Sequence, residues 1–270
     1  MLKAHLSTTT SIVSIVSIVI VTGALALSAC PGGPPADTPD GGPDVQTCSE
    51  PADVSCRDEV FQALLMSLTE VCGINKPCTV ENTPEGDGFV SELDASSNGP
   101  FAIGPWLHVR FTDNGLEPVD VTDDESLNSM DWDLGLHRFT IRLNSGYGGP
   151  SCVTAARTAA NTDFDSLDAV PADLDFNAEL FMSDPEGCEL RPDSSGQGSA
   201  GVVLQNWWTY PGCVATTGNV YVLGLKDGRH VKLVVTQFYE NGQDACNNGG
   251  GSGSASGGGH IKIRWAFLDS

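Results

Sequence analysis

The chain has 270 residues, of which 35 are acidic and 13 are Lys or Arg, so its net charge is −22 at pH 7. A surface this negative repels nucleic acid and anionic lipid, which argues against DNA or RNA as partners. The length is ample for a domain with a sizeable hydrophobic core.

Residues 1–29 predict a lipoprotein signal peptide. Lys3 gives a weakly basic start, and residues 11–27 are apolar with small side chains, as in an export signal. The stretch 27–30 (LSAC) resembles the bacterial lipobox, so we expect Cys30 to carry a diacylglycerol that anchors the protein to the membrane. A plain signal peptide or a single transmembrane helix is the alternative. The prediction is an exported protein held at the cell envelope, at the outer membrane or cell surface.

Residues 30–47 are rich in Pro, Gly and Asp, and they are too polar to bury a core. We expect an extended tether between lipid and domain. Eight cysteines follow Cys30, and an even number behind an export signal predicts up to four disulfides. The chain contains no C-x-x-C spacing, which argues against a zinc site, and we predict no bound metal. The disulfide candidates are Cys48, Cys56, Cys72, Cys78, Cys152, Cys188, Cys213 and Cys246.

Residues 48–80 predict a small helical segment stapled by disulfides. Ser55 and Asp58 are spaced as an N-cap pair, apolar residues recur at helical spacing from 60 to 71, and Gly73 is suited to end the helix. Cys56 and Cys72 would then lie about 24 Å apart at opposite helix ends, too far for a disulfide.

Two pairings remain if the first four cysteines pair among themselves. One is Cys48–Cys56 with Cys72–Cys78, and the other is Cys48–Cys72 with Cys56–Cys78. We favour the second pairing because it would clamp both ends of the helix to flanking loops.

From residue 88 onward the pattern is that of β-strands. We expect one all-β domain over residues 88–268, a single antiparallel β-sheet or sandwich with long loops across 145–201. An acidic loop is expected at 123–125. The shorter strands are expected at 89–93, 105–112, 119–121 and 202–210.

Residues 131–146 (DWDLGLHRFTIRLNSG) alternate apolar and other side chains with one change of phase. This predicts either a strand pair or one long strand with a β-bulge near His137 and Arg138. Asp227-Gly228 between alternating runs at 219–225 and 230–239 is a strong hairpin signal. After a flexible Gly- and Ser-rich loop at 241–259, a regular strand at 260–268 is expected to close the sheet.

Sequence motifs for catalysis are absent or lie in the wrong context. Residues 196–201 match G-x-G-x-x-G, but a strand is expected after them instead of the helix that a phosphate site needs. Asp173, Asp175 and Asn177 resemble the start of a calcium loop, but Ala178 replaces the required Gly. Nothing in the sequence points to a hydrolase triad, and we predict that the protein is not an enzyme.

The central stretch and the C-terminal hairpin together resemble the HmuY family of bacterial surface lipoproteins, whose founding members bind haem. The resemblance covers roughly residues 88–268. Its most specific part is a W-D-x-x-x-H-R run followed by Asn six residues later. The matching positions are Trp106, Trp132-Asp133, His137-Arg138, Leu143-Asn144, Tyr221-Val222, Asp227-Gly228, Val231-Lys232 and the final strand to Phe267.

The resemblance implies an all-β fold and a haem held by two histidines between extended loops. In the family these ligands follow the W-D…H-R run and precede the D-G hairpin, and this chain has no histidine between His137 and His230. His137 corresponds to the histidine of the run, which is not a ligand. Haem is therefore a possible cofactor with replaced ligands, for which His108, His230, His260 and Met182 are the candidates.

We interpret the chain as a non-enzymatic, membrane-anchored binding module for a small apolar ligand such as haem. Trp207, Trp208 and Tyr210 are candidates to line the ligand cleft, because aromatic residues supply area and orientation. Packing in the sheet core is the alternative role for these three residues. The alternative function is a disulfide-stapled structural or adhesion component of the envelope with no small ligand. Exposure of the two tryptophans would favour binding, and burial of both would favour the structural role.

Overall fold

The computed structural model describes residues 47–73, 76, 78–183, 186–249, 251, 253 and 255–269, which all lie within one unit, Gly41–Ser270. The predicted signal peptide, Cys30 and residues 31–46 of the tether lie outside the described residues. Within the described part of the chain, no helix is long and apolar enough to cross a membrane.

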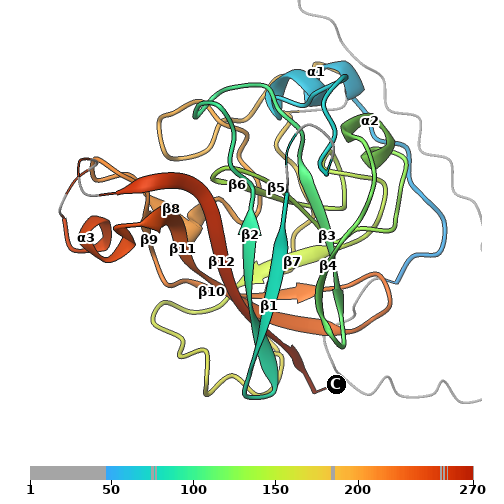
Figure 1. Cartoon of the computed structure of the whole chain (residues 1–270). Coiled ribbons are helices and arrows are strands. Elements are labelled where there is room, and N and C mark those ends of the chain that lie inside the picture. Colours follow the sequence, from blue (N-terminus) through green and yellow to red (C-terminus); the bar gives the residue numbers. More distant parts are fainter. Residues whose placement is uncertain are drawn as a thin grey trace, which may run out of the picture. The chain divides into compact units, whose positions relative to one another are not determined.

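Two antiparallel sheets form the body of the protein (Figure 1). The larger sheet has six strands in the order β1-β2-β12-β11-β10-β7. These strands are β1 (Val80–Glu85), β2 (Gly88–Asp94), β7 (Thr154–Arg157), β10 (Val220–Gly224), β11 (His230–Asn241) and β12 (Ser256–Leu268). The smaller sheet has the order β4-β3-β5-β6, made of β3 (Leu107–Thr112), β4 (Gly115–Pro118), β5 (Leu134–His137) and β6 (Thr140–Leu143).

The two sheets share one hydrophobic core. Val109 and Leu136 of the smaller sheet belong to the same buried cluster as Leu233 and Trp265 of the larger one. Alternation along each strand places these side chains on the inner faces. The predicted antiparallel all-β fold is therefore confirmed.

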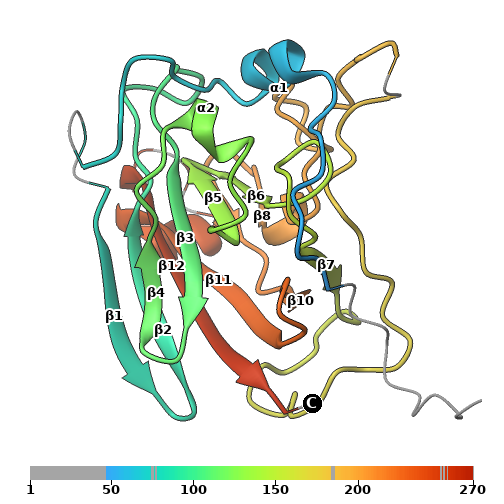
Figure 2. The ribbon, with the colours of Figure 1, turned by 90° about the vertical axis from the view of Figure 1, so that its right-hand side faces the viewer.

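Short elements complete the chain. A two-stranded sheet pairs β8 (Trp208–Thr209) with β9 (Ala215–Thr216). The helices are α1 (Arg57–Ala63), α2 (Asp123–Ser126), α3 (Gln243–Asn247) and the 3₁₀ turn η1 (Gln205–Trp207). Figures 1 and 2 show α1 and α2 at the end of this unit that lies opposite the C-terminus.

The Asp227-Gly228 hairpin is confirmed. β10 and β11 pair antiparallel from Val220 to His230, and Gly228 adopts the positive φ, 90°, that the turn requires. The final strand is longer than predicted, beginning at Ser256 inside the expected flexible loop, which also contains α3. β12 pairs with both β2 and β11, so it is an interior strand and does not close an edge.

The central stretch is a strand pair and not a bulged strand. β5 and β6 pair with His137 opposite Thr140, so Arg138 and Phe139 form a two-residue turn. Arg138 has a φ of 51°, as tight hairpin turns require. This turn causes the change of phase that the sequence pattern showed.

The predicted helix at residues 55–73 is wrong in length. α1 ends at Ala63, and Leu65 adopts a φ of 53°, which turns the chain away from the helix. The helix begins after Cys56 without a side-chain cap. The carbonyl of Leu64 instead accepts a 2.9 Å hydrogen bond from the indole of Trp106, so tertiary contacts override the helical periodicity.

All eight candidate cysteines form disulfides, but the favoured pairing is wrong. Cys72 does not lie on α1 and pairs with Cys78, while three further disulfides reach across the chain. These are Cys48–Cys152, Cys56–Cys188 and Cys213–Cys246. Cys72–Cys78, which belongs to the other pairing, links the N-terminal segment to itself, whereas Cys48 and Cys56 join this segment to distant loops.

Three further predictions are corrected. Residues 202–210 form η1 and the short β8 instead of one strand, and 119–121 follow β4 as irregular chain. The acidic loop at 123–125 is helix α2, because Thr122 and Glu125 form a capping box.

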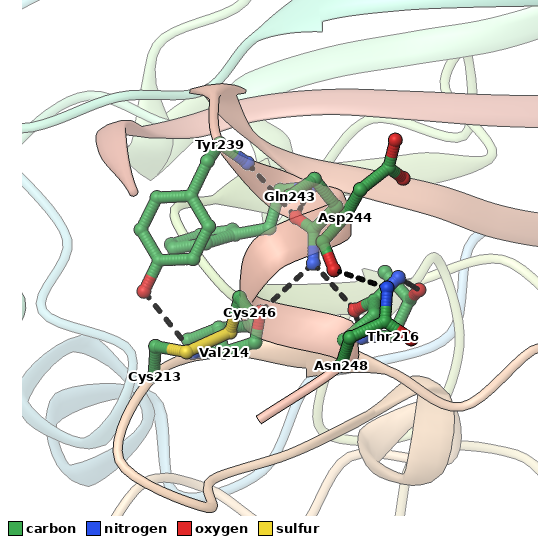
Figure 3. The surroundings of a disulfide bond; sticks show 10 residues. Cys213, Val214, Thr216, Tyr239, Gln243, Asp244, Cys246 and Asn248 are labelled. Carbon is green, nitrogen blue, oxygen red and sulfur yellow. Dashed lines mark hydrogen bonds between the residues drawn. A yellow bond between two sulfur atoms is a disulfide. The ribbon is translucent and has the colours of Figure 1, made fainter. Parts of the chain in front are cut away.

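Figure 3 shows how the Cys213–Cys246 disulfide joins α3 to the chain before β9. Gln243 of α3 donates to the carbonyl of Val214 at 3.1 Å, and the hydroxyl of Tyr239 accepts from the Val214 amide at 3.0 Å. The disulfide and these two bonds hold residues 213–216 against β11.

Candidate functional site

A cavity of about 380 Å³ lies where α1, the β5–β6 turn and the loops at 97–104 and 182–200 meet. This volume is within the usual range of ligand pockets, about 300–1,000 Å³. Its walls are mainly apolar and include Leu64, Leu65, Phe101, Phe139, Met182 and Leu190. Phe101 is 47% exposed, which places it at the mouth of the cavity. We call this cavity the main pocket.

His137, the last residue of β5, lines the main pocket. Its ring stacks on Trp106 with 5.5 Å between centroids, and the side chain is 4% exposed. Its buried Nε2 has no hydrogen-bond partner among the described residues. Burial, followed by the charges of Lys76 and Arg138, lowers the pKa of His137 to about 4. The imidazole is therefore neutral at physiological pH and can act as a ligand.

Met182, in the 182–200 loop, lines the same pocket. It is buried and pairs with Leu190 in an isolated β-bridge. The neighbouring Cys188 is joined to Cys56 at the start of α1. The disulfide thus fixes the Met182 loop to the helix that forms the facing wall.

A second cavity of about 190 Å³ adjoins the main pocket, since Pro100, Phe101 and Phe139 line both. We call it the aromatic side pocket. Its other walls are mostly aromatic, and Arg138 is its cationic residue. Those lining residues include Trp208, Tyr210, Phe238 and Tyr239.

The three predicted aromatic residues have different positions. Trp207 is 1% exposed and donates its indole N–H to the carbonyl of Phe139 at 3.0 Å, so it supports the wall without lining either cavity. Trp208 is also buried in the core, but it lines the aromatic side pocket together with Tyr210, which is 51% exposed. The structure thus brings Trp208 and Tyr210 together and places Met182 in the adjoining cavity.

The three candidate histidines do not converge. His108 is buried with its Nε2 2.8 Å from Arg142, and burial with this positive charge lowers its pKa well below the ordinary value. His230 pairs with Leu268, while His260 lies eight residues earlier on β12, about 26 Å away along the strand. His230 and His260 are therefore too far apart to ligate one iron, and the Nε2 of His108 already faces Arg142.

The other residues of the W-D…N run are engaged in hydrogen bonds within the fold. The indole of Trp132 donates to the carbonyl of Ser126 at 3.0 Å, and the carboxylate of Asp133 accepts from the Phe111 amide at 2.9 Å. Asn144 bridges the Trp132 carbonyl and the Ser151 amide. The histidine of the run was assigned no ligand role from the sequence, and its position in a pocket wall is visible only in the fold.

Within the described ranges, no group of three or more His, Cys, Asp or Glu is arranged to hold a metal ion. The calcium-loop resemblance at 173–177 is interrupted by a β-bridge between Asn177 and Ala155.

These features define a disulfide-linked antiparallel β protein with an apolar pocket at one end. The HmuY protein family model matches residues 103–249, more than half of the chain, and the chain belongs to this family. The resemblance seen in the sequence is confirmed.

The solved structures similar to this chain include the following three. One is a protein from Bacteroides vulgatus proposed to be an HmuY-like haem-binding protein, with 17% identity, a TM-score of 0.44, and coverage of 71% of this chain and 98% of that chain. Another is a protein from Bacteroides fragilis proposed to be a lipoprotein, with 12% identity, a TM-score of 0.43, and coverage of 70% and 96%. The third is the apo HmuY analogue of Tannerella forsythia, with 21% identity, a TM-score of 0.35, and coverage of 62% and 80%. No curated protein matches the chain.

Proposed function

We propose that the chain is an exported, lipid-anchored binding protein that holds a flat, apolar ligand of the haem class in the main pocket. The observation that carries the proposal is that one apolar cavity is lined by Met182 and by His137, whose neutral imidazole has no partner for its Nε2 among the described residues. Membership of the HmuY family supports it.

The residues present fit a haem. His and Met side chains are known to bind haem iron, and His137 and Met182 are the residues of these types that would hold it in the main pocket. When bound, haem would supply the iron that these two side chains hold. The apolar walls would exclude water, and the side pocket extends the space available to a wide ligand.

A haem titration of the mature chain, with Cys30→Ser to prevent lipidation, tests the proposal. We expect a Soret shift that saturates at one equivalent. His137→Phe and Met182→Leu should each weaken binding and change the absorption bands of the ligated iron. His260→Phe and Met130→Leu are matched controls and should leave both unchanged.

Two results would contradict the proposal in different ways. If haem binds equally well to both pocket variants, the iron site lies elsewhere in the chain. If the unaltered chain gives no shift beyond that of free haem, then the alternative of a structural or adhesion component becomes the better interpretation. The burial of Trp207 and Trp208 is consistent with that alternative.

A further inference from the structure

Arg138, in the β5–β6 turn, is one of the residues that line the aromatic side pocket. Its Nη1 donates two long hydrogen bonds, each 3.4 Å, to the carbonyls of Ser97 and Gly258. Its Nε is buried and has no partner in the part of the chain that the structure describes. The guanidinium also lies 5.7 Å from the ring centroid of Phe238. This cation is half-buried and largely unsatisfied.

Four of the seven other arginines form ion pairs with carboxylates, while Arg142, Arg157 and Arg191 form none with the described residues. Arg57 pairs with Asp124, Arg110 with Glu117, Arg229 with Asp113 and Asp227, and Arg264 with Glu85 and Asp165. Arg138 forms no ion pair with any described carboxylate. With 35 acidic residues available, a half-buried arginine without one is a candidate for an external anion.

Lys76 is a second cation in the same neighbourhood. Its ammonium is buried and has no hydrogen-bond partner among the described residues. Burial, opposed by Asp94 and reinforced by the charge of Arg138, lowers the pKa of Lys76 to about 8. The carboxylate of Asp94 is engaged with the Ser96 amide at 3.0 Å. The charge of Asp94 partly offsets the repulsion between Lys76 and Arg138, and an added carboxylate would reduce this repulsion further.

We propose that Arg138, assisted by Lys76, binds a carboxylate group of the ligand whose apolar body occupies the main pocket. The inference rests on the proposed function, because it assumes that the main pocket is filled. A guanidinium matches the two oxygens of a carboxylate, and aromatic walls strengthen such a bond by excluding water. The ligand class is therefore an anionic amphiphile, apolar over its body and carboxylated at one edge.

The affinities for haem and for its dimethyl ester, in which both carboxylates are blocked, can be compared. This comparison distinguishes carboxylate recognition from binding of the apolar body alone. We expect the unaltered mature chain to bind haem more tightly than the ester. Arg138→Gln should weaken haem binding about tenfold or more, because it removes the charge-assisted hydrogen bond between the guanidinium and the haem carboxylate. Ester binding should stay unchanged, because the ester has no carboxylate to form this bond. Lys76→Gln should act in the same direction with a smaller effect.

The surface variant Arg110→Gln is the matched control and should bind both ligands as the unaltered chain does. Equal weakening of acid and ester by Arg138→Gln would overturn the inference, since it would mean a structural role for Arg138. Equal affinity of acid and ester in the unaltered chain would also overturn it, while leaving the proposed function intact. Failure of both ligands to bind would instead overturn the proposed function.

Discussion

Two arginines of one hairpin, four positions apart, have opposite environments. Arg142 in β6 is fully buried, with its guanidinium 4.9 Å and 4.5 Å from the ring centroids of Trp106 and Trp132. It donates to the Ser126 hydroxyl at 2.8 Å and to the carbonyl of Gly148, and its Nη2 lies 2.8 Å from the Nε2 of His108. Arg138 in the turn has only long bonds to two carbonyls.

This difference separates the part of the hairpin that stabilises the fold from the part that we propose to bind the ligand. At the strand end of the hairpin, tryptophan rings and hydrogen bonds hold a buried cation in place. At the turn end, the Nε2 of His137 has no partner among the described residues and Arg138 has two long bonds. The Nε of Arg142 also lacks a described partner, but both of its terminal nitrogens are bonded. A structural cation and a candidate binding cation thus occur within one sequence motif.

Arg142→Met is expected to have the largest effect. It removes the positive charge that faces the buried carboxyls of Asp123 and Glu179, whose pKa values burial already raises to about 6 and about 7. We expect the free energy of unfolding to fall by about 3–5 kcal/mol, as when one partner of a buried ionic group is removed. Urea unfolding followed by tryptophan fluorescence measures this loss. A loss of unfolding free energy below about 1 kcal/mol would mean that Arg142 stabilises the fold no more than Arg138 does.

His137 gives an intermediate effect that depends on pH. Its folded pKa of about 4 lies below the ordinary 6.5, so between these values the unfolded chain binds a proton that the folded chain does not. Stability is therefore lost as pH falls from 6.5 to 4, by about 3 kcal/mol. In His137→Phe this part of the loss should disappear. Unfolding curves across that range measure it, with His260→Phe as control. Parallel pH profiles for His137→Phe and the unaltered chain would show that His137 is not buried as described.

Arg138→Gln should have the smallest effect on stability. Its two hydrogen bonds are long and its guanidinium has no described carboxylate partner, so we expect a change below about 1 kcal/mol. The positive φ at this turn position is equally accessible to Gln and to Arg, so the substitution adds no backbone strain. The measurement is the same urea unfolding used for Arg142→Met. A loss of unfolding free energy as large as that of Arg142→Met would mean that Arg138 also stabilises the fold.

Local sequence signals predicted much of the fold correctly. The Asp227-Gly228 turn chemistry and the alternation in 107–112 specify a hairpin and a strand through interactions between near neighbours. The alternation in 131–146 located both strands of the central hairpin but could not separate a bulge from a two-residue turn. Both shift the phase of the pattern in the same way.

The candidate site was predicted only in part. Met182 was identified as a candidate, and it lies in the main pocket. His137 lies 45 positions earlier and meets Met182 only because the β5–β6 hairpin and the 182–200 loop pack against α1. Trp207 has the same residue type as Trp208, yet its indole bonds to Phe139 and it lies outside both cavities. Sequence spacing carries no information on such contacts.

By itself the sequence determined the all-β class, the position of the main hairpin and the use of eight cysteines in disulfides, because these depend on periodicity, turn chemistry and residue count. Only the tertiary structure decided which cysteines pair, where α1 ends and which nitrogen atoms are left without partners. The physical reason is that disulfide reach, helix termination at Leu65 and hydrogen-bond satisfaction depend on distances between residues far apart in the chain.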